Sequence, residues 1–419
     1  MNPELARKVQ AHERELSSKR RALRTSIRQK QKELASLPRS GESKERLRKL
    51  ERVQSVVQKH WPSHWPAVEV CLTACASLLL KDVGQSLSIV LLGRSAAGKG
   101  TVLEMFQGAE RTLWRDKFSK ASLLSGHGDS SKQELEARAL FKASKHQLVL
   151  IGDLNPLLKA GAKEGLSSFY GDFAVWLDGK GLVYDYGTHG TLGEKGDFTF
   201  ALVGGATPFQ AETWRGMAEL GPRMLFFPVR SPKEKVAYEQ YEPAKNECRD
   251  AVHALLKELT TTPTRSLPWR KCDPKIPKQL GRFCELMALG QTVGSAVGSR
   301  NLASRPESSH LEQRLATLVH ARALLYGRDA LDESDVAFAR KFVLTTSPNK
   351  RGVVLLAMSE GAYEAQQIVE ASGLAYGTVN STLEDMRSAG IVERCGALPR
   401  EGRGRPAEIW KIRPAEEDA

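Results

Sequence analysis

The chain has 419 residues, of which 41% are hydrophobic and 26% charged, and its formal net charge is +13. A chain of this length can form two or three domains, and this composition excludes an intrinsically disordered protein. The first residues lack the apolar segment of a signal peptide, so we expect a cytoplasmic protein.

Residues 1–60 form a basic segment with a helical pattern. They contain 17 lysines and arginines and only seven glutamates, a net charge of +10. Apolar residues from Leu5 to Leu37 recur at spacings of three, four or seven, which predicts a helical hairpin or a weak coiled coil, broken at residues 38–41. The charge fits contacts with nucleic-acid phosphates and equally fits a solvated helix used for assembly.

Residues 67–80 are mostly apolar, with Glu69 as their one charged residue. This stretch is too short to span a bilayer. We expect a buried helix there, beneath a sheet. Cys71 and Cys75 lie one helical turn apart in it, which favours two buried small hydrophobic residues. The six cysteines have no C-x-x-C spacing, so neither a zinc site nor a disulfide framework is indicated.

A glycine-rich loop with one lysine follows the apolar run at residues 88–92 and precedes a helical pattern. This order is typical of a P-loop, which binds the phosphates of a nucleoside triphosphate, here ATP; a plain glycine turn is the alternative. A glycine stands where a Ser or Thr usually binds Mg²⁺, so the nearest hydroxyl is that of Thr101. The predicted ATP-binding residues are Gly93, Arg94, Ser95, Ala96, Ala97, Gly98, Lys99, Gly100 and Thr101.

Apolar strand patterns alternate with helical ones from residue 61 to 230, which predicts an α/β fold with a doubly wound parallel sheet. Strands are expected at 88–93, 119–125, 147–153, 198–204 and 224–229, and helices at 132–144 and 155–177. Residues 231–345 are expected to be helical, apart from a proline-rich turn at 261–277.

Asp153 ends the third of these strands, at the position of a Walker B carboxylate that holds Mg²⁺ opposite the γ-phosphate. Capping of the helix that begins near Asn155 is the alternative role. The next residue is Leu154, whereas a glutamate usually stands there and polarises the attacking water. The sequence therefore supports ATP binding better than ATP hydrolysis.

A glycine-punctuated, alternating segment at residues 178–197 predicts a β-hairpin, inserted before the strand that ends at Thr207. Arg223 precedes the last strand of the sheet.

The C-terminal pattern describes a winged helix-turn-helix: helices at 351–360, 365–372 and 376–389, then strands at 391–394 and 408–412 around a basic loop. In this arrangement the third helix and the basic loop contact DNA. Protein contact is the alternative, and Glu384 and Asp385 count against DNA. The candidate DNA-binding residues are Tyr376, Thr378, Asn380, Ser381, Arg400, Arg403 and Arg405.

The order of these features resembles that of AAA+ ATPases of the pre-sensor-1 hairpin clade. The similarity is greatest to minichromosome-maintenance-type helicases and to the shorter ATPases of phages and integrative elements. It implies a P-loop AAA+ core at 61–230, a helical lid at 231–345 and a winged helix at 346–419, with the basic segment 1–60 outside it.

The resemblance also implies roles for individual residues. Thr207 corresponds to sensor 1, which orients the attacking water or the γ-phosphate and is more often an asparagine. Arg223 corresponds to the arginine finger that acts in a neighbouring subunit's site. Arg314 corresponds to sensor 2, with Arg305 as second choice. Each arginine has an ordinary alternative as a surface ion-pair residue.

Hairpins of this clade line the pore of a ring and contact DNA, so Tyr186, His189 and Lys195 are candidate pore residues; a short structural hairpin is the alternative.

The expected function is that of an oligomeric ATPase, with a hexameric ring as the expected assembly, that binds ATP and Mg²⁺ at subunit interfaces. It would move along or remodel DNA, as a helicase or translocase in the replication or maintenance of a phage or mobile element. A slowly hydrolysing, nucleotide-gated DNA-binding switch is the alternative. A small-molecule kinase is a third hypothesis, because Gly-Lys-Gly-Thr also occurs in adenylate-kinase-like loops, but arginine-rich substrate-binding segments are not evident.

Overall fold

The computed structural model describes residues 41–116, 123, 139–160, 167–186, 190–209, 213–214, 222–231, 236–267, 273–292, 308–347, 350–398 and 407–413. The chain divides into two units, residues 1–45 and 46–419. Nearly all of the described residues belong to the second unit, and most of the predicted basic segment lies outside the described residues.

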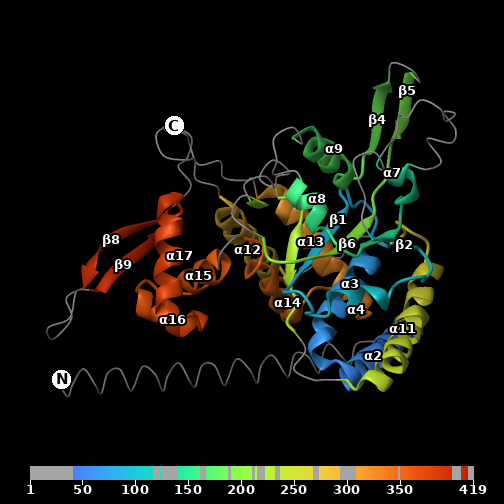
Figure 1. Ribbon diagram of the computed structural model, residues 1–419, viewed down its shortest axis with the longest axis horizontal. Coiled ribbons are helices and arrows are strands. Elements are labelled where there is room, and N and C mark those ends of the chain that lie inside the picture. The colour runs from blue at the N-terminus through green and yellow to red at the C-terminus, as the bar shows by residue number, and fades with distance from the viewer. Residues whose placement is uncertain are drawn as a thin grey trace. The chain divides into compact units, whose positions relative to one another are not determined.

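A five-stranded parallel sheet lies at the centre of the second unit and has the strand order β2-β3-β6-β1-β7. Helices lie on both sides of its labelled strands β1, β6 and β2 (Figure 1). Parallel neighbours cannot be joined by tight turns, so helices connect them and cover both faces. The predicted mixed α/β fold with a parallel sheet is therefore confirmed. The strands are β1 (Leu87–Leu92), β2 (Thr112–Arg115), β3 (Leu148–Ile151), β6 (Ala201–Ala206) and β7 (Leu225–Pro228).

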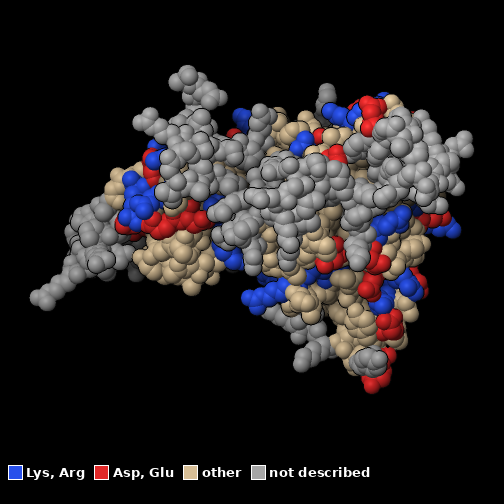
Figure 2. Space-filling model, turned by 45° about the horizontal axis from the view of Figure 1, so that its top comes forward, with Lys and Arg blue, Asp and Glu red and all other residues tan. Residues whose placement is uncertain are grey.

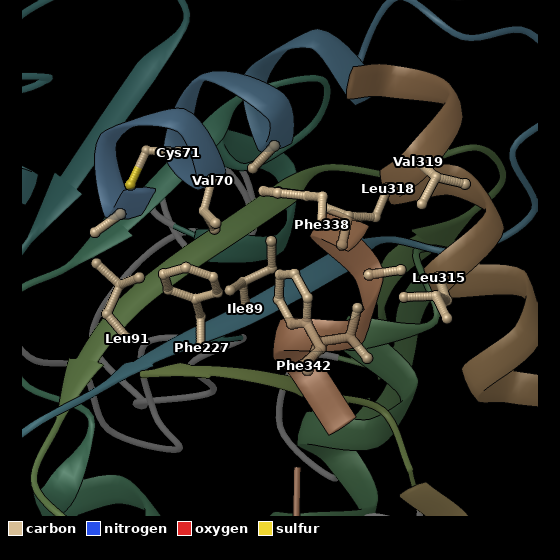
Figure 3. Close-up of a cluster of buried hydrophobic side chains, with 14 of the residues drawn as sticks. Val70, Cys71, Ile89, Leu91, Phe227, Leu315, Leu318, Val319, Phe338 and Phe342 are labelled. Atoms are coloured by element: carbon tan, nitrogen blue, oxygen red, sulfur yellow. The ribbon is translucent and has the colours of Figure 1, made fainter. Parts of the chain in front are cut away.

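Successive side chains of each strand point to opposite faces of the sheet, so two hydrophobic cores form. Ile89 and Leu91 of β1 belong to one core, and Val90 between them belongs to the other. Figure 3 shows the first core, where side chains of β1 and β7 meet those of three helices.

The helices over the first core are α3 (Trp65–Ser77), α13 (Ser309–Leu325) and α14 (Glu333–Val343), with the short α4 (Lys99–Glu104) following β1. All residues of α3 except Pro66 are buried, as expected for the apolar stretch. Its single acid, Glu69, accepts a hydrogen bond from Nε of Arg322 (2.8 Å), which also binds Asp335 (2.7 Å). The buried carboxylates are thus paired with a cation, which offsets the cost of their burial.

The second core lies under α7 (Leu140–Ala143), α8 (Asn155–Ala160) and α9 (Ser167–Leu177). Both α8 and α9 lie within the helix predicted at 155–177, whose residues 161–166 lie outside the described residues. The predicted hairpin is present: β4 (Gly181–Tyr186) pairs antiparallel with β5 (Gly190–Lys195).

The structure describes four more helical elements before the C-terminal region: α2 (Gly41–His60), η1 (Pro62–His64), α11 (Tyr238–Thr261) and α12 (Lys275–Gln291). η1 and α11 contact α3, and α12 contacts α13 and α14. Ion pairs from Lys49 to Glu258 (2.8 Å) and from Lys59 to Glu247 (2.9 Å) join α2 to α11. Buried side chains of α2 belong to the first core, so the packing continues across the domain boundary predicted at residue 60.

The described residues of the C-terminal region form three helices and an antiparallel strand pair: α15 (Arg351–Ser359), α16 (Ala365–Ser372), α17 (Tyr376–Ser388), β8 (Val392–Leu398) and β9 (Ala407–Ile412). Arg351 joins it to α12, because its Nη1 donates to the carbonyls of Gly290 (3.2 Å) and Thr292 (2.7 Å).

Two strand predictions need correction. Leu123, the described residue within the strand predicted at 119–125, is helical. The sheet instead has the edge strand β2, which is only four residues long and partly exposed, so it lacks a clear apolar pattern. β6 begins at Ala201 and not at residue 198, because Asp197 accepts a hydrogen bond from the backbone N–H of Thr199 (3.1 Å) in a turn.

Within the described ranges, no helix is long and apolar enough to cross a lipid bilayer.

Candidate functional site

The predicted P-loop lies between β1 and α4, at the carboxyl ends of the parallel strands. Its geometry requires glycine at two positions. Gly98 has a φ of +85°, and a Cβ there would lie 2.1 Å from Nε2 of the buried His64. A Cβ on Gly93 would lie 2.6 Å from the carbonyl oxygen of Val229. Only a residue without a side chain fits either position.

Lys99 begins α4 and folds back over this loop. Its Nζ donates to the carbonyl oxygens of Gly93 (2.7 Å) and Arg94 (2.8 Å). Burial lowers the pKa of Lys99, and the negative charge of Asp153 opposes the shift. A bound phosphate would compete with the two carbonyls for this ammonium.

Asp153 and Thr207 follow the carboxyl ends of β3 and β6, and Asn155 joins them. Oδ1 of Asp153 accepts hydrogen bonds from the backbone N–H (2.9 Å) and from Nδ2 (2.5 Å) of Asn155. Oδ1 of Asn155 accepts hydrogen bonds from the backbone N–H (3.2 Å) and from the hydroxyl (2.9 Å) of Thr207. The bond to the Asn155 N–H is the local turn that the capping alternative predicted, and it uses one of the two carboxylate oxygens.

Leu154 points away from this cluster into the second core. It is fully buried, and a Cβ on Gly204 of β6 would lie 2.4 Å from its Cδ1. A Cβ on Gly205 would lie 2.9 Å from the Gly152 carbonyl and 3.6 Å from Cβ of Lys99. The two glycines of β6 thus make room for the Leu154 side chain and for the Gly152 carbonyl, and the side chain at the position of the usual general base does not face the P-loop.

Thr101 is directed toward α11. Its hydroxyl forms a hydrogen bond with the hydroxyl of Tyr241 (2.8 Å), whose ring meets that of Trp61 edge-on at 5.6 Å. Thr101 stays a predicted metal ligand, because a hydroxyl that shares one hydrogen bond with Tyr241 keeps a lone pair for a cation.

Of the two predicted metal ligands, Asp153 fits Mg²⁺ better. The described residues contain no group of three His, Cys, Asp or Glu side chains that could hold a metal ion. Mg²⁺ commonly binds through one or two carboxylates, several waters and substrate phosphates. An exposed carboxylate near Lys99 suits a metal that arrives with a nucleotide.

Arg223 and Arg314 lie near the amino ends of the strands, whereas the P-loop lies at their carboxyl ends. Nε and Nη2 of Arg223 donate to the two carboxylate oxygens of Asp178 (2.9 and 3.0 Å). Nη2 of Arg314 lies 3.6 Å from the same carboxylate, and its Nη1 donates to Gln85 (2.7 Å), just before β1. Burial lowers the pKa of Arg314 to about 10.

Arg314, the residue predicted as sensor 2, lies at the opposite end of β1 from the P-loop of its own chain. β1 separates Gln85 from the P-loop, and at a rise of about 3.3 Å per residue the strand spans roughly 20 Å. Arg314 is also only 1% exposed. The second choice, Arg305, lies outside the described residues.

Two of the three hairpin candidates, Tyr186 and Lys195, lie at opposite ends of the β4–β5 strand pair. Tyr186 ends β4 and pairs with Gly190 near the tip, whereas the exposed Lys195 pairs with Gly181 at the base. His189 lies outside the described residues.

On α17, the candidates occupy the first two turns. Tyr376 and Ser381 are exposed, and Thr378 and Asn380 are partly so. The two acids that counted against DNA binding are paired, Asp385 with Arg351 (2.8 Å) and Glu384 with Arg387 (2.8 Å) and Arg394. The wing candidates Arg400, Arg403 and Arg405 lie outside the described residues.

Basic and acidic side chains lie next to one another on the face drawn in Figure 2. This agrees with the charge distribution along the chain, because residues 1–60 carry +10 of the total of +13.

Comparison with known proteins finds no family model that matches this sequence and no curated protein with significant similarity.

Proposed function

We propose that this chain binds ATP with Mg²⁺ at residues 93–101 and hydrolyses it, as a member of the AAA+ ATPases that its motif order resembles. One observation carries the proposal. Lys99, Thr207 and Asp153 come from the ends of three adjacent strands, β1, β6 and β3, and meet at one edge of the sheet.

Each of these residues has a part in the proposed reaction. Lys99 would leave the carbonyls of its own loop and bind the β- and γ-phosphates. Asp153 would hold Mg²⁺ through the carboxylate oxygen that Asn155 does not use, directly or through water. The metal, when bound with ATP, would neutralise charge on the phosphates.

We further propose an oligomer that acts on DNA, as a helicase, translocase or remodeller of a phage or mobile element. Arg223 lies before β7, at the end of the strands opposite to the P-loop, so as an arginine finger it would act in the site of a neighbouring copy. The C-terminal helices and strand pair have the element order of a winged helix, and α17 begins with uncharged polar side chains. The basic segment 1–60 would add contacts with phosphates.

ATP binding and DNA-stimulated hydrolysis test the proposal. We expect Lys99→Ala to abolish turnover, whereas Lys278→Ala, which removes an exposed lysine of α12, should leave it unchanged. Full activity of Lys99→Ala would refute the assignment of the site.

A nucleotide-gated switch is the second candidate, and three observations favour it. Leu154 is buried, Tyr241 holds the hydroxyl of Thr101, and Asp178 holds Arg223. A leucine thus stands where fast hydrolysis would use a glutamate, and the Thr101 hydroxyl and the Arg223 guanidinium form hydrogen bonds elsewhere in the chain. Micromolar ATP binding with a turnover far below about one per second would favour the switch over the motor.

A further inference from the structure

Asn155 has no counterpart among the site residues expected from the sequence, yet it contacts two of them. It is the first residue of α8 and only partly exposed. Its side chain spans the gap between the ends of β3 and β6, two strands that pair along their length.

The hydrogen bonds fix the orientation of this amide. A carboxamide has one accepting oxygen and one donating NH₂ group. The backbone N–H of Thr207 can only donate, so the atom facing it must be the oxygen, and the NH₂ group must then face the carboxylate of Asp153.

The same bonds fix the proton of Thr207. A hydroxyl has a single hydrogen, and the Thr207 hydroxyl donates it to Oδ1 of Asn155 (2.9 Å). The hydroxyl can then only accept a further hydrogen bond through its lone pairs. It would therefore accept from a water molecule and would not donate to a phosphate oxygen.

We propose that Asn155 is a positioning residue that holds Thr207 as a hydrogen-bond acceptor for the attacking water. This inference rests on the proposed ATPase function.

The water oxygen forms a bond to the γ-phosphorus, and the bond from this phosphorus to the β–γ bridging oxygen breaks, its electron pair leaving with ADP. One water proton passes to an oxygen of the released phosphate. Thr207 orients the water and stays unchanged, so the step needs no carboxylate at the position of the buried Leu154.

The test compares Asn155→Ala, Thr207→Val, their double variant and Thr207→Ser. Asn246→Ala is the matched control, because it removes an amide whose oxygen accepts a hydrogen bond from Arg249 (2.7 Å) within α11. Steady-state turnover, affinity for an ATP analogue and thermal midpoint are measured for each variant.

We expect Asn155→Ala and Thr207→Val each to lower kcat by roughly 10- to 100-fold, with ATP affinity within about threefold of the parent protein. The double variant should be no slower than the slower single variant, since both act on one water. Thr207→Ser, which keeps the hydroxyl, should recover most of the turnover.

Three outcomes would overturn the inference: turnover of Asn155→Ala within about threefold of the parent, losses that multiply in the double variant, or weaker ATP binding at unchanged kcat. A lower thermal midpoint at unchanged turnover would mean that Asn155 only stabilises the fold. A parent protein that neither binds nor hydrolyses ATP refutes the proposed function itself, so the two failures are distinguishable.

Discussion

Replacement of Gly98 by alanine tests the geometry of the P-loop directly. The backbone there has a φ of +85°, which costs an L-residue about 1–2 kcal/mol. The new methyl group would also lie 2.1 Å from Nε2 of His64, a buried ring that stacks on Trp61. Such overpacking costs about 1–3 kcal/mol, so Gly98→Ala should destabilise the protein by about 2–5 kcal/mol in total.

The two contributions can be separated with a matched control and a double-mutant cycle. Gly108 has a φ of +81°, and a Cβ at this position would have nothing within 4 Å. Gly108→Ala should therefore show the backbone cost alone. In a His64→Ala background the clash is absent, and Gly98→Ala should again cost only about 1–2 kcal/mol.

Urea unfolding followed by tryptophan fluorescence gives the four free energies of the cycle. If Gly98→Ala costs the same with and without His64, the imidazole does not pack against the loop and the reasoning fails. ATP affinity measured on the same variants should fall with Gly98→Ala, because the loop must move to relieve the clash, and stay near the parent value with Gly108→Ala.

Three further predictions concern other parts of the site and fold. Asp178→Asn leaves Arg223 and the buried Arg314 without their shared anion, so the free energy of unfolding should fall by about 2–3 kcal/mol. Asp250→Asn, a control on the exposed surface of α11, should change this free energy little. Equal effects of the two substitutions would contradict the shared pairing. Leu154→Glu should not raise turnover, because the side chain would enter the second core, and it should cost about 3 kcal/mol of stability; faster hydrolysis would show that position 154 can face the nucleotide. Hydrogen bonds from His60 and Lys59 lower the pKa of Glu247 from 4.5 to about 2, so this contact stabilises the fold above pH 4.5 and is lost as the pH falls toward 2. Glu247→Gln should flatten the pH dependence of Tm in that window, and an unaltered slope would argue against the contact.

The sequence predicted the features that depend on local pattern. β1, β3 and β7 are buried on both faces, so their apolar runs stand out, and the C-terminal helices end at glycines such as Gly373, whose φ is +69°. The edge strand β2 has no such run, because its side chains are partly exposed.

Contacts between distant residues were not predictable in this way. Thr101 and Tyr241 are 140 positions apart, and Asp178 and Arg223 are 45 apart. No spacing rule links such pairs, which meet only when the sheet assembles. Asn155 is different, because an amide two residues after an aspartate that closely follows an apolar strand is a local signal for a polar pair beyond the carboxyl end of that strand.

The P-loop lies at the carboxyl ends of the parallel strands and Arg223 lies near their amino ends. This placement restricts the symmetry of any assembly that joins them. A contact between the loop of one copy and the arginine of the next unites two different surfaces, so it is heterologous. A two-fold axis cannot generate it. Repetition of the contact gives a closed ring where the rotation closes and a helical filament where it does not, and in a filament the two end subunits would each lack one half of a site.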